Sequence, residues 1–137
     1  MYLLDTNVLS EIVRPAPDAR VAAALGKRRT RDLFASVLSR YELRYGASLR
    51  QDADLFWARL QRELLPVVAS WLLVTAEIAE RGGEIGAELR RKGREAGDLD
   101  PLLAATAMVH GLVLVTRNMR HFKPIEGLRI ENWFAER

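Results

Sequence analysis

The stretch from residue 98 to residue 122 constrains the fold more than any other part of the chain. Asp100 and Pro101 form a strong helix start, because the N–H that proline lacks has no partner there and aspartate can accept from free N–H groups. An almost wholly apolar segment follows, and Gly111 can take the left-handed conformation that ends a helix. Residues 112–115 then form a short strand without polar alternation, which is typical of a parallel sheet covered on both faces.

Polar residues lie at both open ends of this helix–strand unit. A helix in an α/β layer runs antiparallel to the strand that it feeds. We therefore expect Asp100, at the start of the helix, to share a sheet edge with Thr116 and Asn118, which follow the strand. Open α/β sheets place their ligands at that edge.

Strands and helices alternate along the rest of the chain. The sequence predicts strands at 2–4, 33–37, 71–74, 112–115 and 128–131. It predicts helices at 8–13, 19–25 and 39–50, a fourth from 52 or 54 to about 65, and a fifth from 76 onward. A sixth is the helix described above, which starts at Asp100 and ends at residue 110. Ser39 and Glu42 match the S-x-x-E capping box at the start of one of these helices. The alternation predicts an α/β fold, a three-layer sandwich with a five-stranded parallel sheet flanked by helices.

Length and composition set further bounds. The 137 residues predict a single domain over 1–137, and a 49% apolar fraction is enough for a real core. No basic region or cleavage site precedes the first strand, so we expect no signal peptide, and no apolar run is long enough to cross a membrane. The absence of cysteine excludes disulfides and thiolate metal sites and is compatible with the cytoplasm, where we expect the protein.

Three acidic residues are expected at the carboxyl edge of the sheet. Asp5 ends the first strand, Glu42 lies early in the helix after the second, and Asp100 begins the helix before the fourth. Like charges raise each other's pKa values, so their convergence favours a hard divalent cation such as Mg²⁺ or Mn²⁺. Such an ion can activate water and stabilise a phosphoryl displacement, and the net charge of +3 leans mildly toward a nucleic-acid backbone as substrate.

Each acid also has a purely structural interpretation. Asp100 can serve only as a helix cap, Glu42 only as the partner of Ser39 in the capping box, and Asp5 only in a loop turn. Asp98 lies two residues before Asp100 and is its rival for the ligand role, although we expect it in a loop or on the surface.

Three blocks of the sequence resemble the PIN-domain ribonucleases, in particular the VapC-type and FitB-like toxins of bacterial type II toxin–antitoxin modules. The blocks are LLDTNVLSE at 3–11, SVLSRYELRYGA at 36–47 and DPLLAATAMVHGLVLVTRN at 100–118. The resemblance implies a Mg²⁺- or Mn²⁺-dependent endoribonuclease. It also implies roles for residues of this chain, with the metal bound by Asp5, Glu42 and Asp100, the catalytic set completed by Thr116 and Asn118, and the substrate contacted by Thr6, Arg117 and Asn118.

The resemblance further implies a homodimer that is neutralised by a small antitoxin and can enter larger toxin–antitoxin assemblies. The pattern departs from many family members at the fourth acid, where Asn118 or His121 stands in place of an aspartate. We expect at least one of these two side chains to face the acidic pocket. The departure also supports an alternative, a PIN-like module that binds RNA or a protein partner with little or no cleavage.

Overall fold

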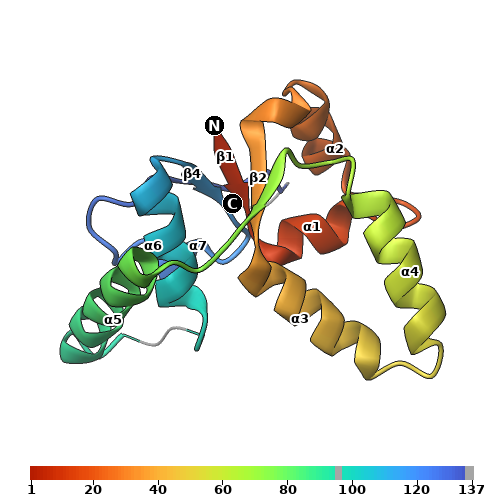
Figure 1. Ribbon diagram of the computed structural model, residues 1–137. Helices are drawn as coiled ribbons and strands as arrows, with labels where there is room; N and C mark the ends of the chain where they lie inside the picture. Colours follow the sequence, from red (N-terminus) through yellow and green to blue (C-terminus); the bar gives the residue numbers. More distant parts are fainter. Residues whose placement is uncertain (95–96, 135–137) are drawn as a thin grey trace.

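Five parallel strands form a sheet in the order β3-β2-β1-β4-β5 (Figure 1). The computed structural model describes residues 1–94 and 97–134. The strands are β1 (Tyr2–Leu4), β2 (Leu33–Ser36), β3 (Ser70–Leu72), β4 (Val113–Val115) and β5 (Ile130–Glu131). All five strands expected from the sequence are present, and their ends agree with the predicted ones to within two residues.

Seven α-helices and a short 3₁₀-helix connect the strands within the described ranges. They are α1 (Thr6–Ile12), α2 (Ala19–Gly26), η1 (Thr30–Asp32, 3₁₀), α3 (Val37–Ser48), α4 (Ala53–Leu64), α5 (Ala76–Arg91), α6 (Asp100–His110) and α7 (Met119–Phe122). The sequence did not predict α7. None of these helices is both long enough and apolar enough to span a bilayer.

Two separate cores lie on the two faces of the sheet, because successive side chains of a strand point to opposite faces. Leu4 and Val115 pack with residues of α1–α4, whereas Leu3 and Leu114 pack with residues of α5–α7. In Figure 1 the first group of helices lies to the right of the sheet and the second to the left. The expected three-layer α/β sandwich is therefore confirmed.

The contact between α5 and α6 depends on a glycine. A Cβ added at Gly82 would lie 2.8 Å from Cδ2 of Leu102, whereas a Cβ at the next residue, Gly83, would meet nothing within 4 Å. Of the three glycines in α5, Gly82 is thus the one that the close approach of the two helices requires.

Helix α3 begins earlier than the sequence predicted. Its N-cap is Ser36, whose Oγ accepts a hydrogen bond from the Leu38 N–H at 3.0 Å. Ser39 lies buried inside the helix, so the predicted Ser39–Glu42 capping box is wrong. The physical reason is that β2 ends at Ser36 and the chain turns at once into the helix. Glu42 therefore has no capping role to perform.

Helix α6 confirms one end of the prediction and corrects the other. Gly111 has φ 65° and ends the helix in the left-handed conformation, as expected. Asp100 is the first residue of the helix but makes no capping hydrogen bond to it. Its Oδ2 accepts instead from the Gly97 N–H at 2.8 Å, in the loop that precedes the helix. The predicted N-cap role of Asp100 is therefore wrong, and its carboxylate lies outside the helix.

Candidate active site

The site lies where the strand order changes direction. From β1 the chain moves to β2 and β3 on one side of the sheet, and then to β4 and β5 on the other. Asp5 follows β1, and Thr116 follows β4, the neighbouring strand. The Asp5 N–H donates to the Val115 carbonyl at 2.9 Å, so the sheet pairing continues into the first site residue. Such a switch point is the usual ligand position in open α/β sheets.

Hydrogen bonds from both strand ends hold the Asp5 carboxylate. Oδ1 accepts from the Thr6 N–H at 2.7 Å, and Oδ2 accepts from the Thr116 hydroxyl at 2.7 Å. The Asn7 side-chain amide donates a longer bond to Oδ2, at 3.4 Å. Thr116 itself is fully buried, so its hydroxyl lies behind Asp5 and orients the carboxylate without reaching the open side of the site.

The Asp5 carboxylate is held in surroundings that disfavour its charge. Only 7% of the residue is exposed. Its pKa is raised from 3.8 to about 6, chiefly by burial, and the negative charges of Asp100 and Glu42 raise it further. The hydrogen bonds from Thr116 and Thr6 lower the pKa but do not offset the burial. No lysine or arginine of the described ranges forms an ion pair with this carboxylate, so at neutral pH it carries an uncompensated charge.

Glu42 projects from the second turn of α3 and is exposed. The Thr6 hydroxyl donates to its Oε1 at 2.5 Å. The hydrogen bond ties α3 to the start of α1 and holds the Glu42 carboxylate at the rim of the site. Thr6 therefore supports one acid with its side chain and another, Asp5, with its backbone N–H.

Asp100 reaches the same edge from the start of α6, where its side chain is 19% exposed. His121, in α7, places its Nδ1 at 3.2 Å from the Asp100 Oδ2. Of the two candidates for the position of the fourth acid, His121 is thus the one in contact with an acid of the site. The exposed Asp98 lies in the turn before α6.

A further residue, Asn7, was not singled out from the sequence. Its Oδ1 accepts from the Arg117 N–H at 3.2 Å while its amide group donates to Asp5, so it joins the segments after β1 and β4. The sequence held a signal for this role, because Asn7 lies two residues after Asp5, at the same strand end as the other site residues. The Arg117 guanidinium lies 4.5 Å from the centre of the Phe134 ring, and the Asn118 N–H donates to the Thr116 hydroxyl oxygen at 3.0 Å.

Comparison with known proteins decides the family. The PIN domain family model matches residues 2–127, which is most of the chain. The chain belongs to the PIN-domain family. Toxin FitB of Neisseria gonorrhoeae is 35% identical over 126 residues, covering 89% of this chain and 91% of the relative. VapC ribonuclease Y4jK of Sinorhizobium fredii is 33% identical over 136 residues, covering 96% of each.

The fold of this PIN domain also matches solved structures closely. The crystal structure of FitAcB from Neisseria gonorrhoeae superposes with a TM-score of 0.88 at 31% identity, over 99% of this chain and all of that one. Other similar solved structures are of VapBC proteins from several bacteria. The five-stranded parallel sheet between helices is therefore the fold of the family.

The acids of this PIN domain act on one another electrostatically, since Asp100 and Glu42 both raise the pKa of Asp5, but they do not form a closed set of ligands. Among residues 1–94 and 97–134, no three Asp, Glu or His side chains are grouped closely enough to hold a metal ion by themselves. Glu42 is hydrogen-bonded to Thr6 instead. Asp5 and Asp100 remain as the inner acids. Two carboxylates with water as additional ligands are the usual arrangement for Mg²⁺, so the residues present fit such an ion.

Proposed function

We propose that the protein is a Mg²⁺- or Mn²⁺-dependent endoribonuclease and the toxin of a type II toxin–antitoxin module. The observation that carries the proposal is the Asp5 carboxylate, buried beside Asp100 and Glu42 with a pKa raised to about 6 and no ion-pair partner in the described ranges. At neutral pH such a site lacks a cation that would balance its negative charge. The relative named VapC ribonuclease supports RNA as the substrate.

In this proposal Asp5 and Asp100 hold the metal, partly through water, with Glu42 nearby. When bound, the ion supplies an activated water and stabilises the charge that develops on the cleaved phosphodiester. Thr116 fixes the direction of the Asp5 carboxylate through the hydroxyl hydrogen bond at 2.7 Å. Thr6 holds Glu42 at the rim, and the exposed Asn118 and Arg117 are positioned to contact the substrate. Oxygen-only ligands favour Mg²⁺ or Mn²⁺ over softer ions.

Matched aspartate variants test the assignment. Asp5→Asn and Asp100→Asn each remove one negative charge while keeping the size of the side chain. We expect each to lower the rate of RNA cleavage by more than about 100-fold, the upper end for losing a group that only supports a metal ligand. Asp98→Asn is the control, since this exposed residue lies two positions before Asp100. Unchanged metal-dependent cleavage by both site variants would refute the assignment.

A specific observation favours the second candidate function, a module that binds RNA with little or no cleavage. His121 contacts Asp100 at the place where many family members have an acid, which leaves the site with less negative charge. Chelation separates the two functions. An endoribonuclease loses its activity in EDTA and regains it with Mg²⁺ or Mn²⁺, whereas a binding module retains RNA in EDTA and cleaves it under neither condition.

The antitoxin is expected in a groove that begins at the acidic rim. A hollow of about 370 Å³ extends from Thr6 and Glu42 over the apolar side chains of Leu43, Phe56 and Leu60, between α1, α3 and α4. An apolar face of a small protein fits this groove, and an arginine of the same partner can pair with Glu42. The partner is tested by co-purification with the product of the neighbouring small gene, with Phe56→Asp as the variant that should release it.

The homodimer also belongs to the proposal. Tyr41 and Tyr45 on α3 and Leu73 after β3 are at least 60% exposed, which leaves apolar surface available for a second copy. Trp57 and Trp71, in contrast, pack partly buried against the core. Light scattering at micromolar concentrations is the measurement, and a monomer at all concentrations would contradict the dimer.

A further inference from the structure

A second hollow, of about 700 Å³, lies against the segment that follows β4. It shares a wall with the acidic site, because His121 lines the hollow and also lies 3.2 Å from Asp100, measured from Nδ1 to Oδ2. A strand of substrate that passes the acids can therefore continue into this hollow. The lining comes mostly from one short segment and includes Arg117, Asn118, Arg120, His121 and Lys123.

The lining of this hollow is basic. Among the described residues no aspartate or glutamate contributes to it. Arg120 and Lys123 are exposed, and neither side chain forms an ion pair or hydrogen bond with another residue of the described ranges. Cations gathered without carboxylates in a hollow produce a positive potential that attracts anions.

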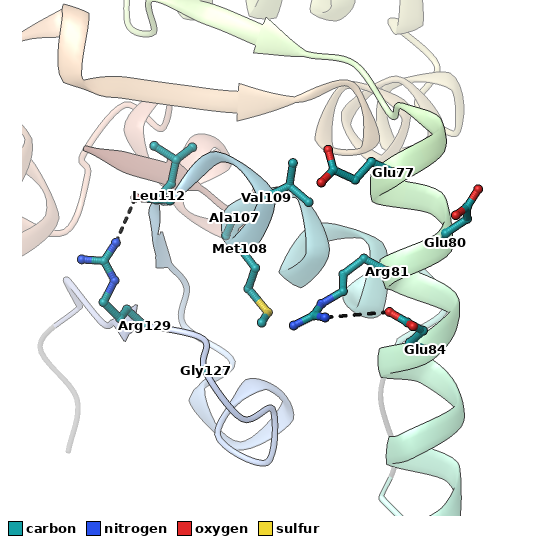
Figure 2. Close-up of a pocket in the computed structure, with 11 residues that line it drawn as sticks. Glu77, Glu80, Arg81, Glu84, Ala107, Met108, Val109, Leu112, Gly127 and Arg129 are labelled. Atoms are coloured by element: carbon teal, nitrogen blue, oxygen red, sulfur yellow. Dashed lines mark hydrogen bonds and ion pairs between the residues drawn. The ribbon is translucent and has the colours of Figure 1, made fainter.

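A hollow elsewhere on the molecule shows the contrast. At the carboxyl end of α6, a cavity of about 650 Å³ is lined by Arg81 and Arg129 together with Glu77, Glu80 and Glu84 (Figure 2). Figure 2 shows Arg81 directed to Glu84, and their charged groups are 3.8 Å apart. The Arg129 guanidinium donates to the Gly111 carbonyl at 2.9 Å. The cations there are matched by carboxylates or backbone oxygens, whereas Arg120 and Lys123 have no such partner among the described residues.

We propose that Arg120 and Lys123 form a subsite that binds backbone phosphates of the RNA strand next to the cleaved bond, an inference that rests on the proposed function. Arg120 lies on α7, and Lys123, three positions later, is the C-cap residue of that helix in helical conformation. Their side chains therefore project from the same side, with Cβ atoms about 5–6 Å apart. Guanidinium and ammonium groups are the usual donors to phosphate oxygens.

The position of the hollow favours RNA over an acidic peptide as its occupant. The acids of the site repel any polyanion, so a nuclease needs cations close by to hold the strand. Arg120 and Lys123 supply such charges within two positions of His121, which itself contacts Asp100. An acidic peptide is repelled by the carboxylates of Asp5 and Asp100 and, unlike the substrate of a nuclease, does not have to lie beside them.

The test is RNA binding in the absence of metal. Fluorescence anisotropy with a labelled 12-nucleotide single-stranded RNA, in EDTA, compares the wild type with Arg120→Gln/Lys123→Gln over a range of salt concentrations. Each phosphate contact adds about 0.7 to the slope of log K against log salt for single strands. We expect the double variant to lose about 1.4 from the slope and to bind about 20-fold more weakly at 0.1 M salt.

A charge-matched control is available in the chain. Lys27 and Arg29 are exposed and precede β2, at the opposite edge of the sheet from the acids. Lys27→Gln/Arg29→Gln removes the same charge, and we expect it to keep the wild-type slope. The proposal is overturned if the two double variants lose equal affinity, if Arg120→Gln/Lys123→Gln keeps the wild-type slope, or if this variant loses binding to a poly-glutamate peptide but not to RNA.

Cleavage assays with Mg²⁺ or Mn²⁺ separate this proposal from the proposed function. We expect Arg120→Gln/Lys123→Gln to raise KM by about the same factor as the dissociation constant while kcat stays near the wild-type value. A wild type that binds the RNA through these residues but never cleaves it overturns the nuclease and leaves the subsite standing. If the wild type cleaves the RNA and KM is unchanged in the double variant, the subsite is overturned and the nuclease stands.

Discussion

Replacing Asp5 by asparagine should change how the stability of the metal-free protein depends on pH. The pKa of Asp5 is raised from 3.8 to about 6 in the folded protein, mainly by burial. The folded state thus holds the Asp5 proton more tightly than the unfolded chain does. The associated stability is fully present below about pH 4 and is lost as the pH rises through about 6.

The size of this loss follows from the two pKa values. A pKa difference of one corresponds to about 1.36 kcal/mol, so the rise from 3.8 to about 6 lowers the free energy of unfolding at pH 7.5 by about 3 kcal/mol. At pH 4 most of this loss is absent. Asparagine carries no charge at either pH, so Asp5→Asn should lack this part of the pH dependence.

Urea denaturation in EDTA at pH 4 and pH 7.5 measures the effect. Asparagine has one acceptor oxygen, so the variant loses a hydrogen bond from Thr6 or Thr116, but that loss is the same at both pH values. We expect the stability of the variant relative to the wild type to improve by about 2 kcal/mol between pH 4 and pH 7.5. Parallel stability curves for the two proteins would refute the reasoning. A chelator-free arm with Mn²⁺ should stabilise the wild type and not the variant.

Two further predictions concern the helices and the fourth position of the site. Gly82→Ala should destabilise the protein by about 1–3 kcal/mol in urea denaturation, because its Cβ would lie 2.8 Å from Leu102, whereas Gly83→Ala should be neutral or stabilise it by up to about 1 kcal/mol. Equal effects would mean that α5 and α6 are not packed as described. His121→Asp should lower the Mg²⁺ concentration needed for half-maximal cleavage, because it restores a negative charge beside Asp100. Asn118→Asp is the comparison, and a titration in which neither variant differs from the wild type contradicts the idea that the site lacks one negative charge.

The sequence predicted the architecture because its signals are local. The apolar run at 112–115, the glycine at 111 and the alternation of elements each report on a few neighbouring residues, and each was confirmed. Helix starts were predicted less well. Ser36 and Ser39 are both good caps, and the choice between them depends on where β2 leaves its neighbour β3, which is a long-range contact.

The candidate site was predicted only as a set of residues. The edge shared by Asp5, Asp100 and Thr116 follows from strand direction and could be deduced. The hydrogen bond that holds Glu42 at the rim and the contact between His121 and Asp100 depend on side-chain directions, which spacing does not encode. Helix α7 was missed because it has only four residues, too few for a periodic pattern. Arg120 and Lys123 were missed with it.

The pairing of β1 with β4 has a consequence for the synthesis of the protein. Asp5 leaves the ribosome early, but the hydroxyl that orients it belongs to Thr116, 111 residues later. Chains grow at about 5–20 residues per second, so several seconds separate the two events. During this interval β1 lacks its neighbour β4, and Asp5 lacks first Asp100 and Thr116 and then, for the last 16 residues, Thr116 alone. The nascent chain is thus without its complete acidic site until nearly all of it has been made.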